Sequence, residues 1–214
     1  MILQIDNREP KHLINYIINL LESENIKIKY EIKPLDVGDY IIYDNINNVE
    51  LVIFERKSLK DLEASIKDGR YNEQSFRLNN NFLHNHNIYY IIEGSIVNYR
   101  NNSFKNTLYS TLISLSYYKG FSVLNSLNDV ESMMLIYRFI NKLVREKQKL
   151  PYYTNTNTNT NTNTNTNTNT NTNTNTENSN NIQYVDVIKS SKKANITKDN
   201  INTIMLMQIP GVSV

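Results

Sequence analysis

An uninterrupted alternation of Thr and Asn from Thr154 to Thr176 limits how much of this 214-residue chain can fold. The tract has no apolar side chain to bury, so it cannot offset the conformational entropy that is lost when a chain is ordered. We interpret it as the body of a flexible low-complexity linker, residues 151–181. Strict alternation also suits a strand, and Asn-rich tracts can form cross-β stacks, so an aggregation-prone tract is the alternative. The sequence therefore predicts one folded domain, residues 1–150, and a segment at 182–214 that is too short for a core of its own.

The composition excludes several classes of protein. The chain has 23 Lys and Arg residues and 21 Asp and Glu residues. The resulting formal charge of +2 does not by itself indicate a nucleic-acid partner. The absence of cysteine excludes disulfides, Cys-based zinc sites, iron–sulfur clusters and a thiol nucleophile. The sequence has no apolar stretch of the roughly 18 to 20 residues that span a membrane, and charged residues interrupt its start. We expect a soluble, intracellular protein that makes no membrane contact.

Within residues 1–150, apolar patterns predict strands mixed with helices. Such a mixture indicates an α/β domain with a central sheet and helices on its faces. We expect strands at residues 1–5, 26–32 (half-buried), 40–43, 51–54, 88–92 and 121–124, and helices at 11–21, 58–66, 71–83, 104–118 and 129–146.

Charged residues interrupt the apolar strands at informative places. The apolar run 51–54 continues directly into Glu55, Arg56 and Lys57. Because side chains alternate along a strand, Glu55 and Lys57 should lie on one face and Arg56 on the other. Asp39 stands where the preceding strand begins. This D…ExK arrangement suits a metal-dependent phosphodiester hydrolase, in which carboxylates bind Mg²⁺ and the lysine orients a water or the scissile phosphate. Solvated charges at a strand end are the alternative.

A second acidic cluster follows the first strand, in the order Asp6-Asn7-Arg8-Glu9. Asp6 could cap the following helix and Glu9 could interact favourably with its dipole. This structural role and a functional one are compatible.

The arrangement of these residues resembles the ERCC4-type nuclease family, and within it the Mus81 branch more than the XPF branch. The family signature G-D…E-R-K-x-x-x-D-L is present as Gly38-Asp39, Glu55-Arg56-Lys57 and Asp61-Leu62. The segment 66–78 is similar to the Mus81-type continuation of that signature. Asp6 and Glu9 match the acidic pair after the family's first strand, Ile91-Ile92-Glu93-Gly94 resembles its later strand, and the resemblance covers about residues 2–147.

The resemblance implies a restriction-endonuclease-like fold, with a central mixed sheet flanked by helices. It also implies an enzyme that cuts one strand of branched or flapped DNA during repair, recombination or replication, using Mg²⁺ or Mn²⁺. By position, Asp39 and Glu55 would hold the metal, and Asp6 and Glu9 would complete or bridge a second metal site.

The same resemblance assigns roles to four cationic residues. Lys57 would position the attacking water and stabilise the charge that develops on the phosphate. Arg56 would either anchor the phosphate or brace the carboxylates. Arg70 and Arg77 are seven residues apart, which puts them on one side of a helix and about 10 Å from each other, a spacing that suits contact with a DNA backbone. Solvated arginines or internal salt bridges are the alternative for this pair.

Two other functions use the same residues. Because the family pairs active chains with inactive ones, the chain could be a non-catalytic DNA-binding subunit, although its site residues are all present. A metal-dependent phosphodiesterase acting on small nucleotides is the other alternative. The resemblance also implies a homodimer or a heterodimer with another ERCC4-type chain, in the nucleus of a cell or at a cytoplasmic replication site if the protein is viral.

The last residues predict a helix at 200–209, followed by Pro210-Gly211. This segment is similar to the start of a helix-hairpin-helix unit, in which Gly211 would present backbone N–H groups to a DNA phosphate. The second helix of such a unit is missing. We therefore expect residues 182–214 to begin a truncated helix-hairpin-helix domain of a longer protein.

Overall fold

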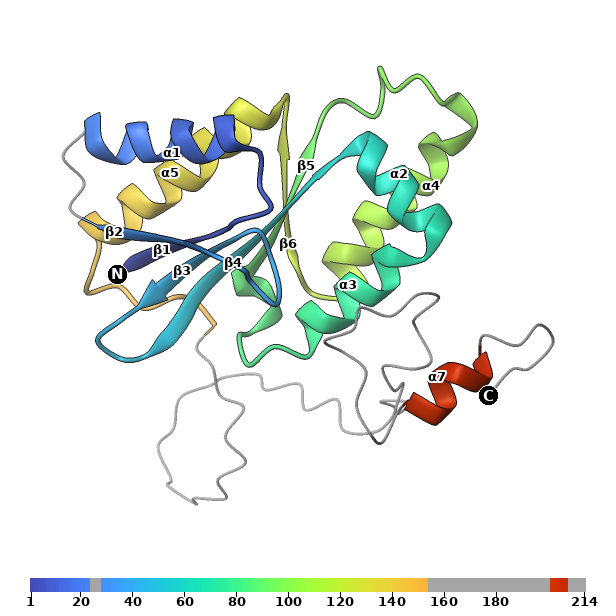
Figure 1. The fold of residues 1–214 in the computed structure, drawn as a ribbon. Coiled ribbons are helices and arrows are strands. Elements are labelled where there is room, and N and C mark those ends of the chain that lie inside the picture. Colours follow the sequence, from blue (N-terminus) through green and yellow to red (C-terminus); the bar gives the residue numbers. More distant parts are fainter. Residues whose placement is uncertain (24–27, 154–200, 208–214) are drawn as a thin grey trace, which may run out of the picture.

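The computed structural model describes residues 1–23, 28–153 and 201–207 (Figure 1). The Thr-Asn tract lies outside the described residues, as do most of the predicted linker and the hairpin at Gly211. Helix α7 (Ile201–Met207) lies where the sequence predicts the last helix.

The strands form one mixed six-stranded sheet in the order β2-β1-β3-β4-β5-β6. The pairs β1–β2, β4–β5 and β5–β6 are parallel, whereas β3 is antiparallel to β1 and to β4. Each predicted strand is present, and the predicted α/β class is confirmed. The bounds are β1 Ile2–Asp6, β2 Lys29–Lys33, β3 Tyr40–Asp44, β4 Val49–Ser58, β5 Ile88–Glu93 and β6 Ser122–Ser126.

The prediction of half-burial for the second strand is wrong. β2 lies at the edge of the sheet, and Tyr30 and Ile32 are exposed, Ile32 by 49%. Alternation of apolar and polar residues predicted the strand correctly, but it does not tell whether another layer covers the apolar side.

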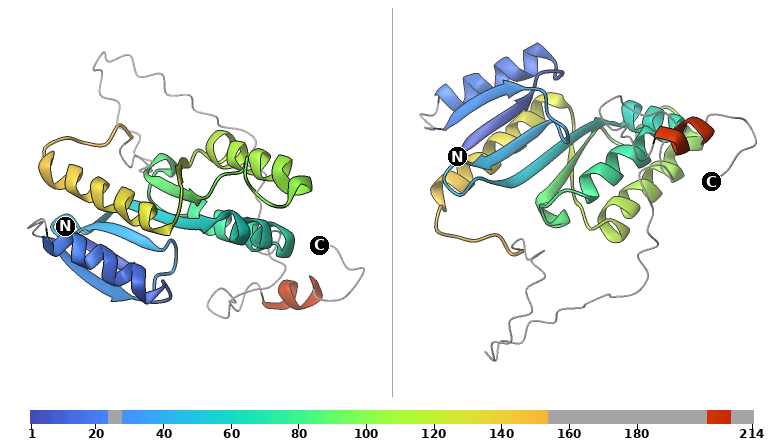
Figure 2. Two further views of the ribbon diagram at one scale, coloured as in Figure 1. Left: turned by 90° about the horizontal axis from the view of Figure 1, so that it is seen from above. Right: turned by 60° about the horizontal axis from the view of Figure 1, so that its bottom comes forward.

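Helices cover both faces of the sheet (Figures 1 and 2). On one face, α1 (Lys11–Ser23) and α5 (Asp129–Arg145) pack against a core that includes Phe54. On the other face, α2 (Leu59–Asp68), α3 (Arg70–Asn79) and α4 (Lys105–Ile113) pack against a core that includes Ile53. We call these the α1–α5 face and the α2–α4 face. Successive residues of β4 thus point into different cores, which follows from the pleat of a strand.

Local sequence signals explain where the helices begin and end. The Ser58 hydroxyl accepts a hydrogen bond from the backbone N–H of Asp61 at 3.1 Å and caps α2. Gly69 adopts a φ of 83°, which glycine tolerates best, and separates α2 from α3. The predicted helix 104–118 is α4 with a 3₁₀ turn before it, η2 (Asn102–Phe104), and a π-helical end, η3 (Ser114–Tyr118). A further 3₁₀ turn, η1 (Asn85–Asn87), precedes β5.

None of the helices in the described part of the chain combines the length and the apolarity needed to cross a membrane.

Candidate active site

The site is built where β4 runs beyond its apolar segment. Glu55 and Lys57 project to the α2–α4 face, and the Nζ atom of Lys57 lies 3.1 Å from Oε1 of Glu55. The prediction that these two side chains share a face is therefore confirmed. Glu55 is buried and Lys57 is 10% exposed. The pair lies at the end of a central strand, where the sheet scaffold fixes both backbones.

Asp39 is held beside this pair by backbone geometry. Its N–H donates to the carbonyl of Phe54 at 2.8 Å, and its Oδ2 accepts from the backbone N–H of Arg56 at 2.7 Å. Gly38 before it has a φ of 71°, and a Cβ there would lie 2.5 Å from the side chain of Ile53. Only glycine fits this turn, so the Gly38-Asp39 pair has a structural reason.

The electrostatics around Asp39 are unfavourable for its charge. Desolvation, and then the negative charges of Glu55 and Glu9, raise the pKa of Asp39 well above its usual value. The Arg56 N–H and the Lys57 ammonium lower it, but they do not compensate. A cation bound between Asp39 and Glu55 would relieve this repulsion.

The donor set fits a small, hard divalent cation. Among the described residues, no three or more His, Cys, Asp or Glu side chains are arranged to hold a metal ion. Mg²⁺ does not require such a cage, because proteins commonly bind it through one or two carboxylates and leave its other positions to water and substrate phosphates. Mn²⁺ also accepts oxygen ligands. Asp39 and Glu55 match this requirement.

Asp6 is occupied by other partners. Its side chain is 2% exposed and accepts hydrogen bonds from the backbone N–H and the Nε of Arg8, both at 2.8 Å, and from the N–H of Leu35 at 3.3 Å. Burial acts to raise the pKa of Asp6, but the hydrogen bonds and charge of Arg8 outweigh it and lower the pKa. Arg8 is 57% exposed, and its guanidinium also interacts with the charges of Asp39 and Glu55. Sequence reasoning assigned Arg8 no role.

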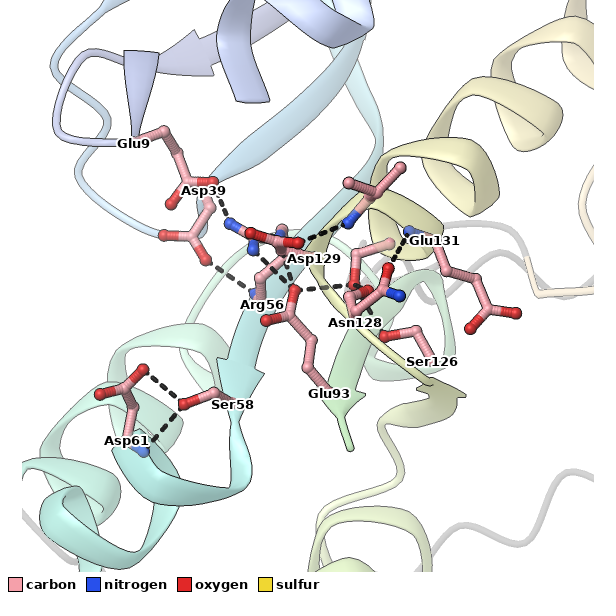
Figure 3. A network of polar contacts seen from close by, with 12 residues as sticks. Glu9, Asp39, Arg56, Ser58, Asp61, Glu93, Ser126, Asn128, Asp129 and Glu131 are labelled. Atoms are coloured by element: carbon pink, nitrogen blue, oxygen red, sulfur yellow. Dashed lines mark hydrogen bonds and ion pairs between the residues drawn. The ribbon is translucent and has the colours of Figure 1, made fainter. Parts of the chain in front are cut away.

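Arg56 projects to the α1–α5 face and forms a closed network there (Figure 3). It pairs with Glu9, and its Nε donates to Oε1 of Glu93 at 2.9 Å. The Ser132 hydroxyl donates to the same Glu93 oxygen at 2.7 Å and lies 2.8 Å from the hydroxyl of Ser126. Of the two roles expected for Arg56, these contacts correspond to bracing the carboxylates.

Two residues at the site, Glu93 and Gln74, are part of the family resemblance but received no role from the sequence. Glu93 ends β5 in the same way that Glu55 follows the apolar part of β4. An apolar strand that leads into a carboxylate was therefore a sequence signal that could have pointed to Glu93. Gln74 on α3 accepts a hydrogen bond from Nζ of Lys57 at 2.7 Å. Gln74 lies in the segment 66–78 that resembles the Mus81-type continuation, but the pattern did not predict its contact with Lys57, because that contact depends on how α3 packs.

Arg70 and Arg77 lie on one helix, α3, as predicted. Arg77 makes internal contacts: its Nε lies 2.8 Å from Oε1 of Glu73, and its Nη1 donates to the carbonyl of Asp36 at 2.5 Å. Arg70 is more exposed and pairs with Asp68 at 2.6 Å. Contact with DNA stays a prediction for both residues.

The fold and the site define an α/β domain with acidic residues gathered at the ends of its central strands. A sequence profile of the ERCC4 domain matches residues 5–139, more than half of the chain. The chain belongs to the ERCC4 domain family, and the predicted resemblance is confirmed.

Similar proteins carry Mus81 and XPF names. A Dictyostelium discoideum protein named "Probable crossover junction endonuclease mus81" is 42% identical over 105 residues, which cover 46% of this chain and 11% of that protein. The rat "Structure-specific endonuclease subunit MUS81" is 39% identical over 90 residues, or 37% of this chain and 16% of that protein. This chain thus spans less than a fifth of the length of either relative. These names agree with the predicted Mus81 branch.

Solved structures share the fold. XPF from Aeropyrum pernix superposes with a TM-score of 0.54 and 26% identity over 69% of this chain and 67% of that chain. The same protein in complex with DNA gives a TM-score of 0.52 and 26% identity over 70% of this chain and 67% of that chain. The predicted sheet flanked by helices is thus found in a solved relative.

Proposed function

We propose that this chain is a metal-dependent endonuclease that hydrolyses a phosphodiester bond in branched or flapped DNA. The observation that carries the proposal is the placement of Asp39 and Glu55 beside Lys57, with carboxylate repulsion that a divalent cation would relieve. The names of the Mus81 relatives and the DNA complex of the XPF relative support the choice of substrate.

The residues of the chain divide the chemistry among them. Asp39 and Glu55 hold the cation, Mg²⁺ or Mn²⁺, which when bound supplies positive charge to a phosphate and acidity to a water. The Lys57 ammonium stabilises negative charge that develops on the phosphate, at a position fixed before the reaction begins. The Arg56 backbone N–H orients Asp39, while the Arg56 side chain braces the opposite face of β4.

Asp6 and Glu9 are secondary candidates for metal binding. Each is paired with an arginine, Asp6 with Arg8 and Glu9 with Arg56. Binding a second cation would require that ion to replace a guanidinium. Their resting role is to hold the segment after β1 against the ends of the neighbouring strands.

The partner that we propose is a second ERCC4-type chain, identical or related. The outer side of α4 and η3 exposes four large apolar or aromatic side chains, and the most exposed of them reach 78%. Groups of exposed large apolar side chains commonly mark protein interfaces. The four residues are Tyr109, Ile113, Tyr117 and Tyr118.

A panel of labelled DNA substrates tests the function. Wild-type protein, Asp39→Asn and Glu55→Gln, each shown to be folded, would be assayed on flapped, forked and linear duplexes with Mg²⁺, with Mn²⁺ and with chelator. We expect cleavage of branched substrates only with wild type and metal. Binding without cleavage by wild type would favour the inactive-subunit alternative, and hydrolysis of a cyclic dinucleotide without DNA cleavage would favour the small-nucleotide alternative.

A further inference from the structure

We propose that Gln74 is a positioning residue for Lys57, and that polar contacts of helix α3 fix the position of Gln74. The inference rests on the proposed function, because it gives the reacting role to Lys57 and a supporting role to Gln74. It also gives Arg77 a role in the docking of α3.

The Lys57 ammonium has two short contacts, one to Gln74 and one to Glu55. Nζ of Lys57 donates to Oε1 of Gln74 at 2.7 Å while it lies 3.1 Å from Oε1 of Glu55. A lysine carries its charge on a flexible stem of four carbons, so one ion pair leaves much of its freedom. A second acceptor on another element restricts the ammonium to one position. Because a carboxamide is neutral, Gln74 does this without adding charge beside Asp39 and Glu55.

Helix α3 is anchored at the segment that leads to Asp39. Glu73 is a buried residue of α3 and pairs with Arg77. The distance from Nε of Arg77 to Oε1 of Glu73 is 2.8 Å. Arg77 then donates to the carbonyl of Asp36 at 2.5 Å. Asp36 precedes Asp39 by three residues. Helix α3, which carries Gln74, is therefore hydrogen-bonded to the segment that leads to Asp39.

A second anchor holds α3 from the end of η3. Nζ of Lys119 donates to the buried hydroxyl of Ser75 at 2.5 Å and lies 5.1 Å from the centre of the Tyr71 ring. Hydrogen bonds and ion pairs are directional, unlike apolar contacts, so they fix the rotation of a helix about its axis. This rotation decides whether the side chain of Gln74 reaches Lys57.

The test compares substitutions on one helix. Gln74→Leu removes the acceptor, Gln74→Glu keeps a carboxyl oxygen for Lys57, and Asn72→Leu removes an exposed carboxamide of α3 as a matched control. Single-turnover cleavage of flapped DNA with Mn²⁺ and the DNA dissociation constant would be measured for each. We expect Gln74→Leu to slow cleavage by about tenfold to a hundredfold with little change in DNA affinity. Gln74→Glu keeps the acceptor but adds a negative charge beside Asp39 and Glu55, so it should recover only part of the rate, and Asn72→Leu should match wild type.

A double-mutant cycle separates positioning from a general structural role. If Gln74 acts through Lys57, Gln74→Leu should cost almost nothing in a protein that already carries Lys57→Ala. Full additivity of the two substitutions would overturn the proposal. So would a loss of DNA affinity that equals the loss of rate, because that result would make Gln74 a DNA contact.

A readout that needs neither metal nor DNA keeps this inference separate from the proposed function. Acetylation of Lys57 by a small reagent, followed by mass spectrometry, should speed up in Gln74→Leu, while acetylation of the exposed Lys60 on α2 stays constant. Unchanged labelling of Lys57 would overturn the positioning contact. Faster labelling in a chain whose wild type cleaves no DNA would leave the contact standing and reject the nuclease function.

Discussion

The two sides of the β4 end contain similar residues in opposite electrostatic states. On the α2–α4 face, burial and neighbouring carboxylates raise the pKa of Asp39, so its charged form is disfavoured. On the α1–α5 face, burial acts to lower the pKa of Arg56, but Glu9 and Glu93 outweigh it and raise the pKa, so its charged form is favoured. The α2–α4 face retains a repulsion that a bound cation would remove, and we call it the strained face. On the α1–α5 face, the satisfied face, Arg56 pairs with Glu9 and Glu93, although the charge of Glu9 also reaches Asp39.

Residues expected to bind the cation and residues that stabilise the fold therefore lie within a few positions of each other on β4, on opposite faces of the sheet. Side chains alternate along a strand, so the sequence Glu55-Arg56-Lys57 supplies one face with a carboxylate and an ammonium and the other with a guanidinium. The strained face is where we place catalysis, because functional sites commonly retain unfavourable charge that the rest of the fold supports. The satisfied face provides that support.

The largest effect that we expect is the loss of cleavage on removing a carboxylate of the strained face. Glu55→Gln keeps the size of the side chain but removes the charge that would hold the cation. Single-turnover cleavage of flapped DNA should fall by more than about 10³, beyond the usual cost of losing one charge-stabilising group. Glu146→Gln, which removes a partly exposed carboxylate just after α5, is the control and should cleave normally. Wild-type rates in folded Glu55→Gln would reject the site.

Disrupting the ion network of Arg56 on the satisfied face should lower the stability of the whole protein rather than affect cleavage alone. Arg56→Met leaves the nearly buried carboxylates of Glu9 and Glu93 without their shared guanidinium. Removing one partner of a buried ion network typically costs about 3–5 kcal/mol of unfolding free energy. Urea denaturation with metal absent would measure this cost. A loss below about 1 kcal/mol would show that the network contributes little to stability.

Lys57→Ala should lower the rate of cleavage more than the affinity for DNA. The ammonium is assigned to stabilising charge in the transition state, so its removal should cost on the order of 10² in single-turnover rate. The DNA dissociation constant, measured in parallel, should change much less. A variant that lost binding but cleaved normally once bound would reverse this assignment.

The raised pKa of Asp39 predicts a smaller, pH-dependent effect on stability. A carboxyl whose pKa is higher in the folded state than its unfolded value near 3.8 favours folding at low pH, and this contribution is lost as the pH rises through the folded-state pKa. In chelator at pH 7, Asp39→Asn should therefore melt a few degrees above wild type. Near pH 3 the two melting temperatures should converge, because Asp39 is then protonated in both states. A less stable Asp39→Asn at pH 7 would contradict the repulsion described for this face.

Sequence periodicity accounts for the strands, and the alternation of Glu55 and Lys57 follows directly from it. It does not predict contacts between side chains that are distant along the chain. Gln74 meets Lys57 only because α3 turns back at Gly69, and Glu93 meets Arg56 only because β5 pairs with β4 in a parallel register. The same limit applies to Arg77, whose helical spacing from Arg70 suggested a shared surface, whereas Glu73 and Asp36 bind its guanidinium.

The most direct test of the contrast between the two faces is Mn²⁺ binding, measured by the loss of the free-ion electron paramagnetic resonance signal. Wild type, Glu55→Gln and Glu146→Gln would be titrated at pH 7. We expect Mn²⁺ to bind wild type and Glu146→Gln alike and to bind Glu55→Gln at least about tenfold more weakly, because even substitutions outside the ligand shell often cost that much. Equal binding by all three proteins would contradict a cation site on the strained face.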